Sequence, residues 1–223
     1  RYISVTGVQT CALPISPNFN KSFVMFIYCP PKPLIELESQ TATDGKRVYT
    51  LPDGIKLPSV TTVVGYFKKK EIIEWRERVG EEEANRVSRL ASTKGRKVHT
   101  ICEKYLNNDV SYLDGVMPDS KQAFKSIQPY LDKINNIHYQ EQVLYSKSIG
   151  LAGRVDCIGE YEGVLSVIDF KTSKRHKERD DILDYFWQTT AYACMYQEMI
   201  GTPINQLVII MTVEGSKPLI FKE

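Results

Sequence analysis

The sequence lacks the features that mark several classes of protein. Its 223 residues contain only five cysteines and no CxxC pair, which argues against a zinc ribbon, a thioredoxin-type site or a disulfide-stapled secreted domain. No apolar run approaches the roughly 18 residues that a membrane-spanning helix needs. A glycine-rich phosphate loop is also missing, so we expect no use of ATP. The formal net charge is only +2, so any surface that binds nucleic acid must be a local concentration of basic residues.

The composition that remains is that of an ordinary globular chain. Hydrophobic residues make up 42% of it and charged residues 25%, both close to the averages for folded domains. The scattered cysteines fit a reducing compartment. We therefore expect one α/β domain without membrane contact, located in the cytoplasm.

The two ends of the chain carry separate expectations. Residues 5–16 read VTGVQTCALPIS, which looks like a translated sequencing-adapter oligonucleotide, and we expect residues 1–16 to be non-native. Residues 17–45 contain a proline cluster and a polar stretch, which predict an extended, poorly ordered segment. The folded domain is expected at 46–223, and its C-terminus is expected to be cut short.

The periodicity of apolar residues changes along the domain. A β-hairpin is expected at 48–64, with its second strand at 59–64 and its turn at Pro52-Asp53-Gly54. Helical spacing covers 71–106, where Gly95 is expected to separate two helices, and then 124–134 with Pro129 inside. Strand-like runs follow at 140–146, 151–160 and 164–172, then a helix at 180–200 and strands at 206–213 and 218–222.

The most informative segment is GRVDCIGEYEGVLSVIDFKTS, residues 153–173. A hairpin that closes symmetrically about Glu162-Gly163 places Asp156 opposite Asp169, with Cβ atoms about 4.5–5.5 Å apart. Two carboxylates at that distance can share a hard divalent cation. Lys171 lies on the same face of the strand as Asp169. An isolated Asp-x-Lys is usually a surface ion pair, but the opposed Asp156 and the apolar strand VLSVID favour a site.

These motifs together resemble a known family. GRVD followed by VIDFK, with KGRKVH upstream and QTTAY downstream, resembles the PD-(D/E)XK nucleases of the RecB-like exonuclease branch. The likeness is greatest to phage exonuclease-like proteins and the mitochondrial genome maintenance exonucleases. It implies a restriction-endonuclease-like α/β core, in which a central mixed β-sheet is flanked by helices, and metal-dependent hydrolysis of DNA.

The resemblance also implies roles for individual residues. Asp156, Asp169 and Lys171 match the catalytic motif, with Mg²⁺ or Mn²⁺ held by Asp156, Asp169, His99 and the Phe170 carbonyl. Gln188 and Tyr192 match the QxxxY motif, and Glu141 is a further candidate acid. The cysteine set of iron-sulfur relatives is absent, so no such cluster is expected. From the residues alone, His99 is more often a structural histidine than a ligand. Gln188 and Tyr192 share one helical face and are expected to contact the substrate strand, but alone they would be read as core polar residues. The basic loop with Lys174 and Arg175 is either solvated or in contact with phosphates.

The function expected from this sequence is that of a metal-dependent DNA exonuclease in phage or bacterial replication, recombination or repair. Single-stranded DNA, or DNA with single-stranded ends, is the expected substrate. A structure-specific or restriction-type endonuclease of the same fold and a non-catalytic nucleic-acid-binding module are the alternatives. The cell compartment implied is the cytoplasm of a bacterium or a phage-infected host. The sequence does not determine the direction of cleavage along the DNA strand or the oligomeric state.

Overall fold

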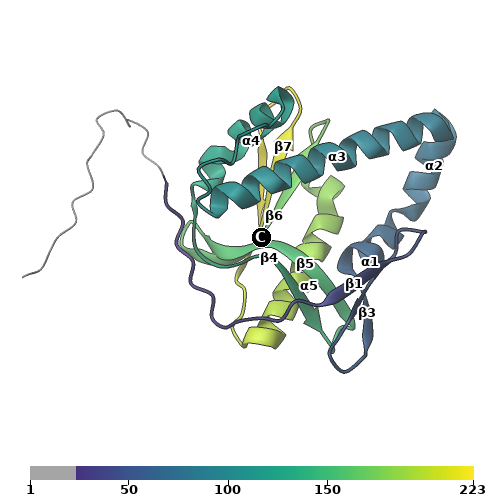
Figure 1. Cartoon of the computed structure of the whole chain (residues 1–223). Coiled ribbons are helices and arrows are strands. Elements are labelled where there is room, and N and C mark those ends of the chain that lie inside the picture. Colours follow the sequence, from purple (N-terminus) through teal and green to yellow (C-terminus); the bar gives the residue numbers. More distant parts are fainter. Residues whose placement is uncertain (1–23) are drawn as a thin grey trace, which may run out of the picture.

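A five-stranded mixed sheet forms the centre of the protein, for which a computed structural model describes residues 24–223 (Figure 1). The expected non-native segment 1–16 lies outside the described residues. The strands lie in chain order, and only β6 and β7 run parallel. This is the mixed sheet that the sequence predicts. Its strands are β4 (Ile134–Ser146), β5 (Leu151–Tyr161), β6 (Val164–Ser173), β7 (Gln206–Val213) and β8 (Leu219–Lys222).

Helices cover both faces of this sheet. On one face, α3 (Glu81–Leu106) and α4 (Pro118–Leu131) pack on the apolar side chains of β4 to β7. On the other face, α1 (Val60–Phe67) and α5 (Leu183–Ile200) pack on β4 to β6. A short 3₁₀ turn, η1 (Arg179–Ile182), leads into α5. Because both faces are covered, burial does not alternate along these strands: residues 166–170 of β6 and 208–213 of β7 are all buried.

The alternation of side chains along β6 distributes residues between the two faces. Ile168 and Phe170 enter the core beneath α3 and α4, whereas Val167 enters the core beneath α5. Asp169 and Lys171 share the parity of Val167, so they project toward α5. The sheet therefore decides which helix each functional side chain can contact.

The helical region before α4 is broken at a different glycine from the one predicted. α2 (Lys69–Val79) ends at Gly80, whose φ of 85° and ψ of 152° interrupt the helix, and α3 then runs unbroken through Gly95. The expected break at Gly95 is therefore wrong. Gly95 lies beside Thr172 of β6, and glycine there leaves room for the close approach of helix and sheet. No residue of α2 is buried, and α2 and the first half of α3 project away from the sheet (Figure 1).

A small three-stranded sheet precedes the helices: β1 (Glu38–Thr41), β2 (Arg47–Thr50) and β3 (Lys56–Pro58). The predicted strand at 59–64 is wrong, because α1 begins there. Ser59 caps this helix, with its hydroxyl accepting a hydrogen bond from the Thr62 backbone N–H at 3.1 Å. The β-branched run VTTVV lies in a helix because its apolar side packs on α5, an example of tertiary contacts overriding propensity.

The other predicted elements need smaller adjustments. Ile134, predicted to end a helix, begins β4, and Pro129 lies in the last turn of α4. Residues 24–45 are largely without regular secondary structure, but they supply β1 and bury Phe26 and Leu37; the predicted poor order of 17–45 stays a prediction. None of the helices within residues 24–223 is long and apolar enough to cross a membrane.

The two helical glycines should respond oppositely to alanine. Gly95→Ala should raise the free energy of unfolding by about 0.5–1 kcal/mol, the usual gain of Ala over Gly in a helix. The added Cβ meets Thr172 Oγ1 at 3.6 Å, an ordinary contact. Gly80→Ala should lower this free energy by about 1–3 kcal/mol, because its backbone conformation suits only glycine. Urea unfolding measures the free energy of unfolding of both variants. If the two substitutions change it by the same amount, the assigned helix break at Gly80 is wrong.

Candidate active site

The hairpin β5–β6 has the register that places Asp156 and Asp169 side by side. Backbone pairing runs from Tyr161 opposite Val164 to Cys157 opposite Ile168, and the next opposed residues are the two aspartates. The ladder ends there. Asp156 Oδ2 accepts a hydrogen bond at 2.8 Å from the backbone N–H of Phe170. The two strands thus separate at the point where the two carboxylates lie.

Asp169 forms a buried polar cluster with α5. Its side chain is 1% exposed, and its Oδ2 lies 2.5 Å from Lys171 Nζ. Gln188 of α5 connects the two residues: its amide donates to Asp169 Oδ1 at 3.2 Å and its carbonyl accepts from Lys171 Nζ at 3.4 Å. A buried carboxylate requires this kind of compensation. The lysine is therefore oriented from two sides.

Asp156 belongs to a second cluster, which contains His99 of α3. Their closest atoms, His99 Nδ1 and Asp156 Oδ2, are 3.5 Å apart. Glu141 of β4 joins them, so that one imidazole nitrogen and two carboxylate oxygens all lie within 4.8 Å of one another. Among the described residues, this is the one group of three or more His, Cys, Asp or Glu side chains with metal-ligand spacing. The group lines a crevice of about 440 Å³.

An irregularity in β4 brings Glu141 to this cluster. Gln140 pairs with Cys157 and Gln142 with Val155, so Glu141 lies opposite Asp156, where the pairing is interrupted. Glu141 has a φ of 50°, in the left-handed region that costs a non-glycine residue about 1–2 kcal/mol. Such strain persists where the surrounding structure imposes it, and it is concentrated at functional sites.

The electrostatics of the two clusters follow from burial and proximity. Burial opposes ionisation of Asp156, but the neighbouring His99 and Lys171 cations hold the pKa of Asp156 below its usual range. Burial disfavours a charged His99, but the Asp156 carboxylate outweighs it and raises the pKa of His99 to about 9. Burial raises the pKa of Asp169 to about 6 and, together with Asp156, that of Glu141 to about 7. The ionised carboxylates thus destabilise one another, and a divalent cation placed between them would relieve that repulsion.

The remaining predicted residues take different positions. Tyr192 is 2% exposed and packs against Gly153 of β5 in the core beneath α5; its contact with substrate stays a prediction. Phe170 buries its ring beneath α3, and metal binding by its carbonyl also stays a prediction. Lys174 and Arg175 lie on an exposed loop that follows β6.

Two residues in or beside the site were missed from the sequence. Tyr185 lies between two cations, with Lys171 Nζ 5.0 Å and Lys68 Nζ 5.5 Å from its ring centroid. It precedes Gln188 by three positions, and this spacing on one helical face could have identified it. Arg154 donates to the Glu141 backbone carbonyl and pairs with Glu36. No sequence signal links these partners, because they meet only through the folded sheet.

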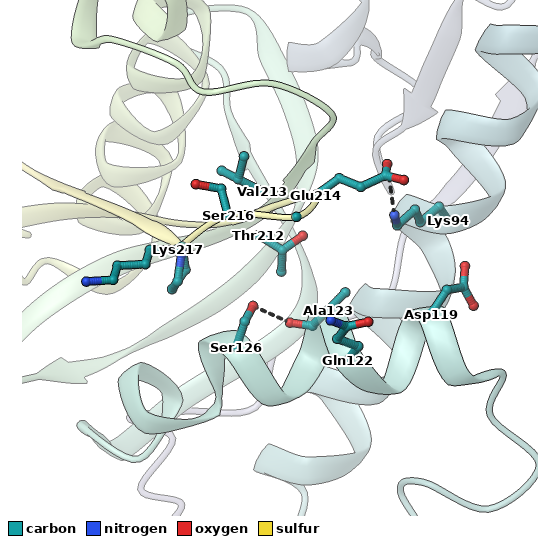
Figure 2. Close-up of a pocket in the computed structure, with 12 residues that line it drawn as sticks. Lys94, Asp119, Gln122, Ala123, Ser126, Thr212, Val213, Glu214, Ser216 and Lys217 are labelled. Atoms are coloured by element: carbon teal, nitrogen blue, oxygen red, sulfur yellow. Dashed lines mark hydrogen bonds and ion pairs between the residues drawn. The ribbon is translucent and has the colours of Figure 1, made fainter.

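A larger cavity of about 810 Å³ lies elsewhere, between α4, the β7–β8 turn and Lys94 of α3 (Figure 2). Lys94 projects across it to Glu214, with Nζ and Oε2 3.3 Å apart. Asp119 and Lys217 complete its charged lining. Its two cations and two carboxylates balance, and the cavity does not contain the histidine-carboxylate cluster described above. The smaller crevice, which contains that cluster, is therefore the candidate active site.

Comparison with known proteins gives the family of the chain. Mitochondrial genome maintenance exonuclease 1 of Mus musculus is 27% identical over 129 residues, which cover 54% of this chain and 38% of that protein. The Homo sapiens protein of the same name is 25% identical over 130 residues, with the same coverage. The chain thus spans less than two fifths of the length of these curated relatives. The model of the PD-(D/E)XK nuclease superfamily matches residues 70–214, more than half of the chain and all of β5, β6 and α5. The chain belongs to the PD-(D/E)XK nuclease superfamily.

Proposed function

We propose that the protein is a metal-dependent DNA exonuclease that hydrolyses phosphodiester bonds. One observation carries the proposal: the His99–Glu141–Asp156 cluster and the Asp169–Lys171 pair meet where β5 and β6 separate. A group of potential metal ligands and a buried lysine at one place are the components that metal-assisted phosphodiester hydrolysis uses. Membership of a nuclease superfamily agrees with this chemistry.

The donor set of the cluster suits a divalent cation. Two carboxylates are preferred by Mg²⁺ and Mn²⁺, and one imidazole favours Mn²⁺ over the harder Mg²⁺. His99, Glu141 and Asp156 are therefore the proposed ligands. Asp169, with its oxygens engaged by Lys171 and Gln188, and the Phe170 carbonyl are proposed as additional ligands. A bound cation would polarise the scissile phosphate and lower the pKa of a water molecule.

The side chains of the protein supply the other parts of the mechanism. Lys171 is the one ammonium group paired with Asp169 in this site, and it would orient water or stabilise negative charge that develops on the phosphate. Gln188 and Tyr185 hold Lys171 in place. Burial strengthens the electrostatic effect of the Lys171 ammonium, because a preorganised charge acts more strongly where water is excluded.

The substrate proposed is single-stranded DNA or DNA with single-stranded ends. The basic loop with Lys174 and Arg175 follows β6 directly, and it would contact backbone phosphates near the site. Two relatives are named exonucleases, which supports attack at ends. A restriction-type endonuclease and a non-catalytic binding module remain the alternatives. The second is disfavoured by the complete Asp156–Asp169–Lys171 set.

The biological setting is also a proposal. DNA replication, recombination or repair in a bacterium or a phage-infected cell, and hence a cytoplasmic location, is what the sequence predicts. The two relatives are mitochondrial by name. A role in the maintenance of DNA is common to both settings.

The proposed metal ligands can be tested by binding alone. His99→Ala and Glu141→Gln should each weaken Mn²⁺ binding about tenfold or more, since even losing a partner of a metal ligand costs about 10–100-fold. The wild type should bind Mn²⁺ more tightly than Mg²⁺. Titration calorimetry measures both. Glu83→Gln, near the start of α3 and paired with Arg86, is the control. Unchanged Mn²⁺ affinity in the His99 and Glu141 variants would remove these residues from the proposed site.

Catalysis can be separated from DNA binding by variants of the buried pair. Lys171→Ala and Asp169→Asn should reduce cleavage by about two to three decades, which is the usual loss on removing a preorganised charge, about 2.7–4 kcal/mol. Binding of DNA in Ca²⁺ should persist. The control is Lys222→Ala, which removes an exposed ion pair with Glu162. Folding is checked by thermal melting. If a folded Lys171→Ala protein cleaves DNA at a rate within threefold of the wild-type rate, the catalytic assignment of Lys171 is wrong.

The requirement for DNA ends can be tested with matched substrates. Linear single-stranded DNA should be degraded with Mn²⁺ or Mg²⁺, whereas a circular strand of the same sequence should resist. The reason is that an exonuclease needs a terminus to begin. Gel analysis over a time course measures both. Equal degradation of the two forms would favour the endonuclease alternative, and no degradation of either would favour the binding module.

A further inference from the structure

We propose that Tyr66, Phe67 and Trp187 form a stacking surface for unpaired bases of the DNA strand that enters the active site. We call these three side chains the aromatic surface. The proposal rests on the nuclease function proposed above and specifies how its substrate is held. It concerns residues outside the metal-binding cluster and the QxxxY motif.

The aromatic surface is unusual in its exposure. Tyr66 is 68%, Phe67 66% and Trp187 48% exposed, although large aromatic side chains normally contribute their area to a core. Phe67 and Trp187 contact each other edge to face, with ring centroids 5.2 Å apart. Their contact holds the two rings at the end of α1 and the start of α5. The faces left open are available to flat, apolar ligands.

The aromatic surface adjoins the active site through α5. Trp187 directly precedes Gln188, whose amide bonds to Asp169 and Lys171. Phe67 directly precedes Lys68, which reaches α5 through an ion pair with Asp184, with Nζ and Oδ1 2.7 Å apart. Lys68 and Lys171 lie against the same ring, that of Tyr185. Contacts therefore continue from the reactive lysine to the aromatic surface.

Cations surround the aromatic surface. Lys69 Nζ lies 5.4 Å from the ring centroid of Tyr66. On the neighbouring loop, burial and the nearby Arg175 and Lys68 lower the pKa of Lys177, which shows how closely these cations are placed. The carboxylates of Asp181 and Asp184 offset part of this charge. Lys68 and Lys171 are paired with Asp184 and Asp169, whereas Lys69, Arg175 and Lys177 form no ion pair among the described residues and leave positive charge in this region.

This combination of groups selects a nucleic-acid strand as the occupant. Bases stack on aromatic side chains while lysines and arginines contact the phosphates, which is how proteins bind single strands without reading sequence. A second copy of this chain would place the same cations against one another. An apolar partner would leave those cations unpaired. A duplex hides the faces of its bases, so the aromatic surface would select for unpaired nucleotides.

Fluorescence of Trp187 can report stacking directly. The chain has two tryptophans, so Trp75→Phe leaves Trp187 as the one reporter. Addition of a short oligothymidylate in Ca²⁺, which supports binding without requiring cleavage, should quench this fluorescence. The same sequence as a blunt duplex should quench it much less. Unchanged fluorescence at saturating single strand would overturn the proposal.

Affinity measurements test the energetic contribution of the rings. Trp187→Ala and Phe67→Ala should weaken binding of the labelled oligothymidylate about tenfold or more, the usual range for losing one stacked base. Trp187→Phe should restore most of the affinity. Val110→Ala, which removes a side chain that is 81% exposed in the turn after α3, is the matched control. Fluorescence anisotropy in Ca²⁺ measures all four variants, with thermal melting to verify folding.

The outcomes separate this proposal from the nuclease function. Quenching and weakened binding without cleavage in either metal would support the stacking surface and contradict the nuclease. Cleavage with unaltered binding in both alanine variants would contradict the stacking surface alone. Self-association of the wild type that is lost in Phe67→Ala, with unaltered DNA affinity, would assign the aromatic surface to a second copy and overturn the proposal.

Discussion

The structure depends on the compensation of two carboxylates buried at the centre of a sheet. Asp156 and Asp169 lie on adjacent strands, where unpaired charges would cost several kcal/mol each. Each receives its partners from a different side. Lys171 and Gln188 compensate Asp169, whereas His99 and the Phe170 backbone N–H compensate Asp156. The sheet and both helical layers must therefore be in place before both charges are stabilised.

In this arrangement the two faces of the sheet contribute different residues to the candidate site. The α3 side provides His99 and, with Glu141, the histidine-carboxylate cluster. The α5 side provides Gln188 and Tyr185, which orient the lysine. The proposed cation binding and charge stabilisation should therefore respond differently to mutation, because they depend mainly on different helices. The strained backbone at Glu141 helps to form the histidine-carboxylate cluster. It interrupts the pairing of β4 with β5 opposite Asp156, which an ideal strand would not do.

Recognition of substrate is placed outside the reactive cluster. In the proposed nuclease, the buried residues of the site would act on any phosphodiester, so selectivity among nucleic acids would come from surfaces around them. Tyr66 and Phe67 lie within two residues of Lys68, and Trp187 is adjacent to Gln188 on α5, which also contributes to the candidate site. Stacking is tolerant of sequence, because every base has a flat face. This tolerance suits an enzyme that degrades a strand of any sequence.

The sequence by itself determined the features that depend on neighbouring residues. The turn at Glu162-Gly163 sets the register of β5 and β6, because the pairing is closed locally, and Gly201 ends α5 in the left-handed conformation. Only the tertiary structure decided which contacts distant segments make. It turned the β-branched run after Ser59 into a helix by packing it on α5, and it brought Glu141 and His99 to Asp156. Those outcomes depend on packing between elements far apart in the chain, which local propensity does not encode.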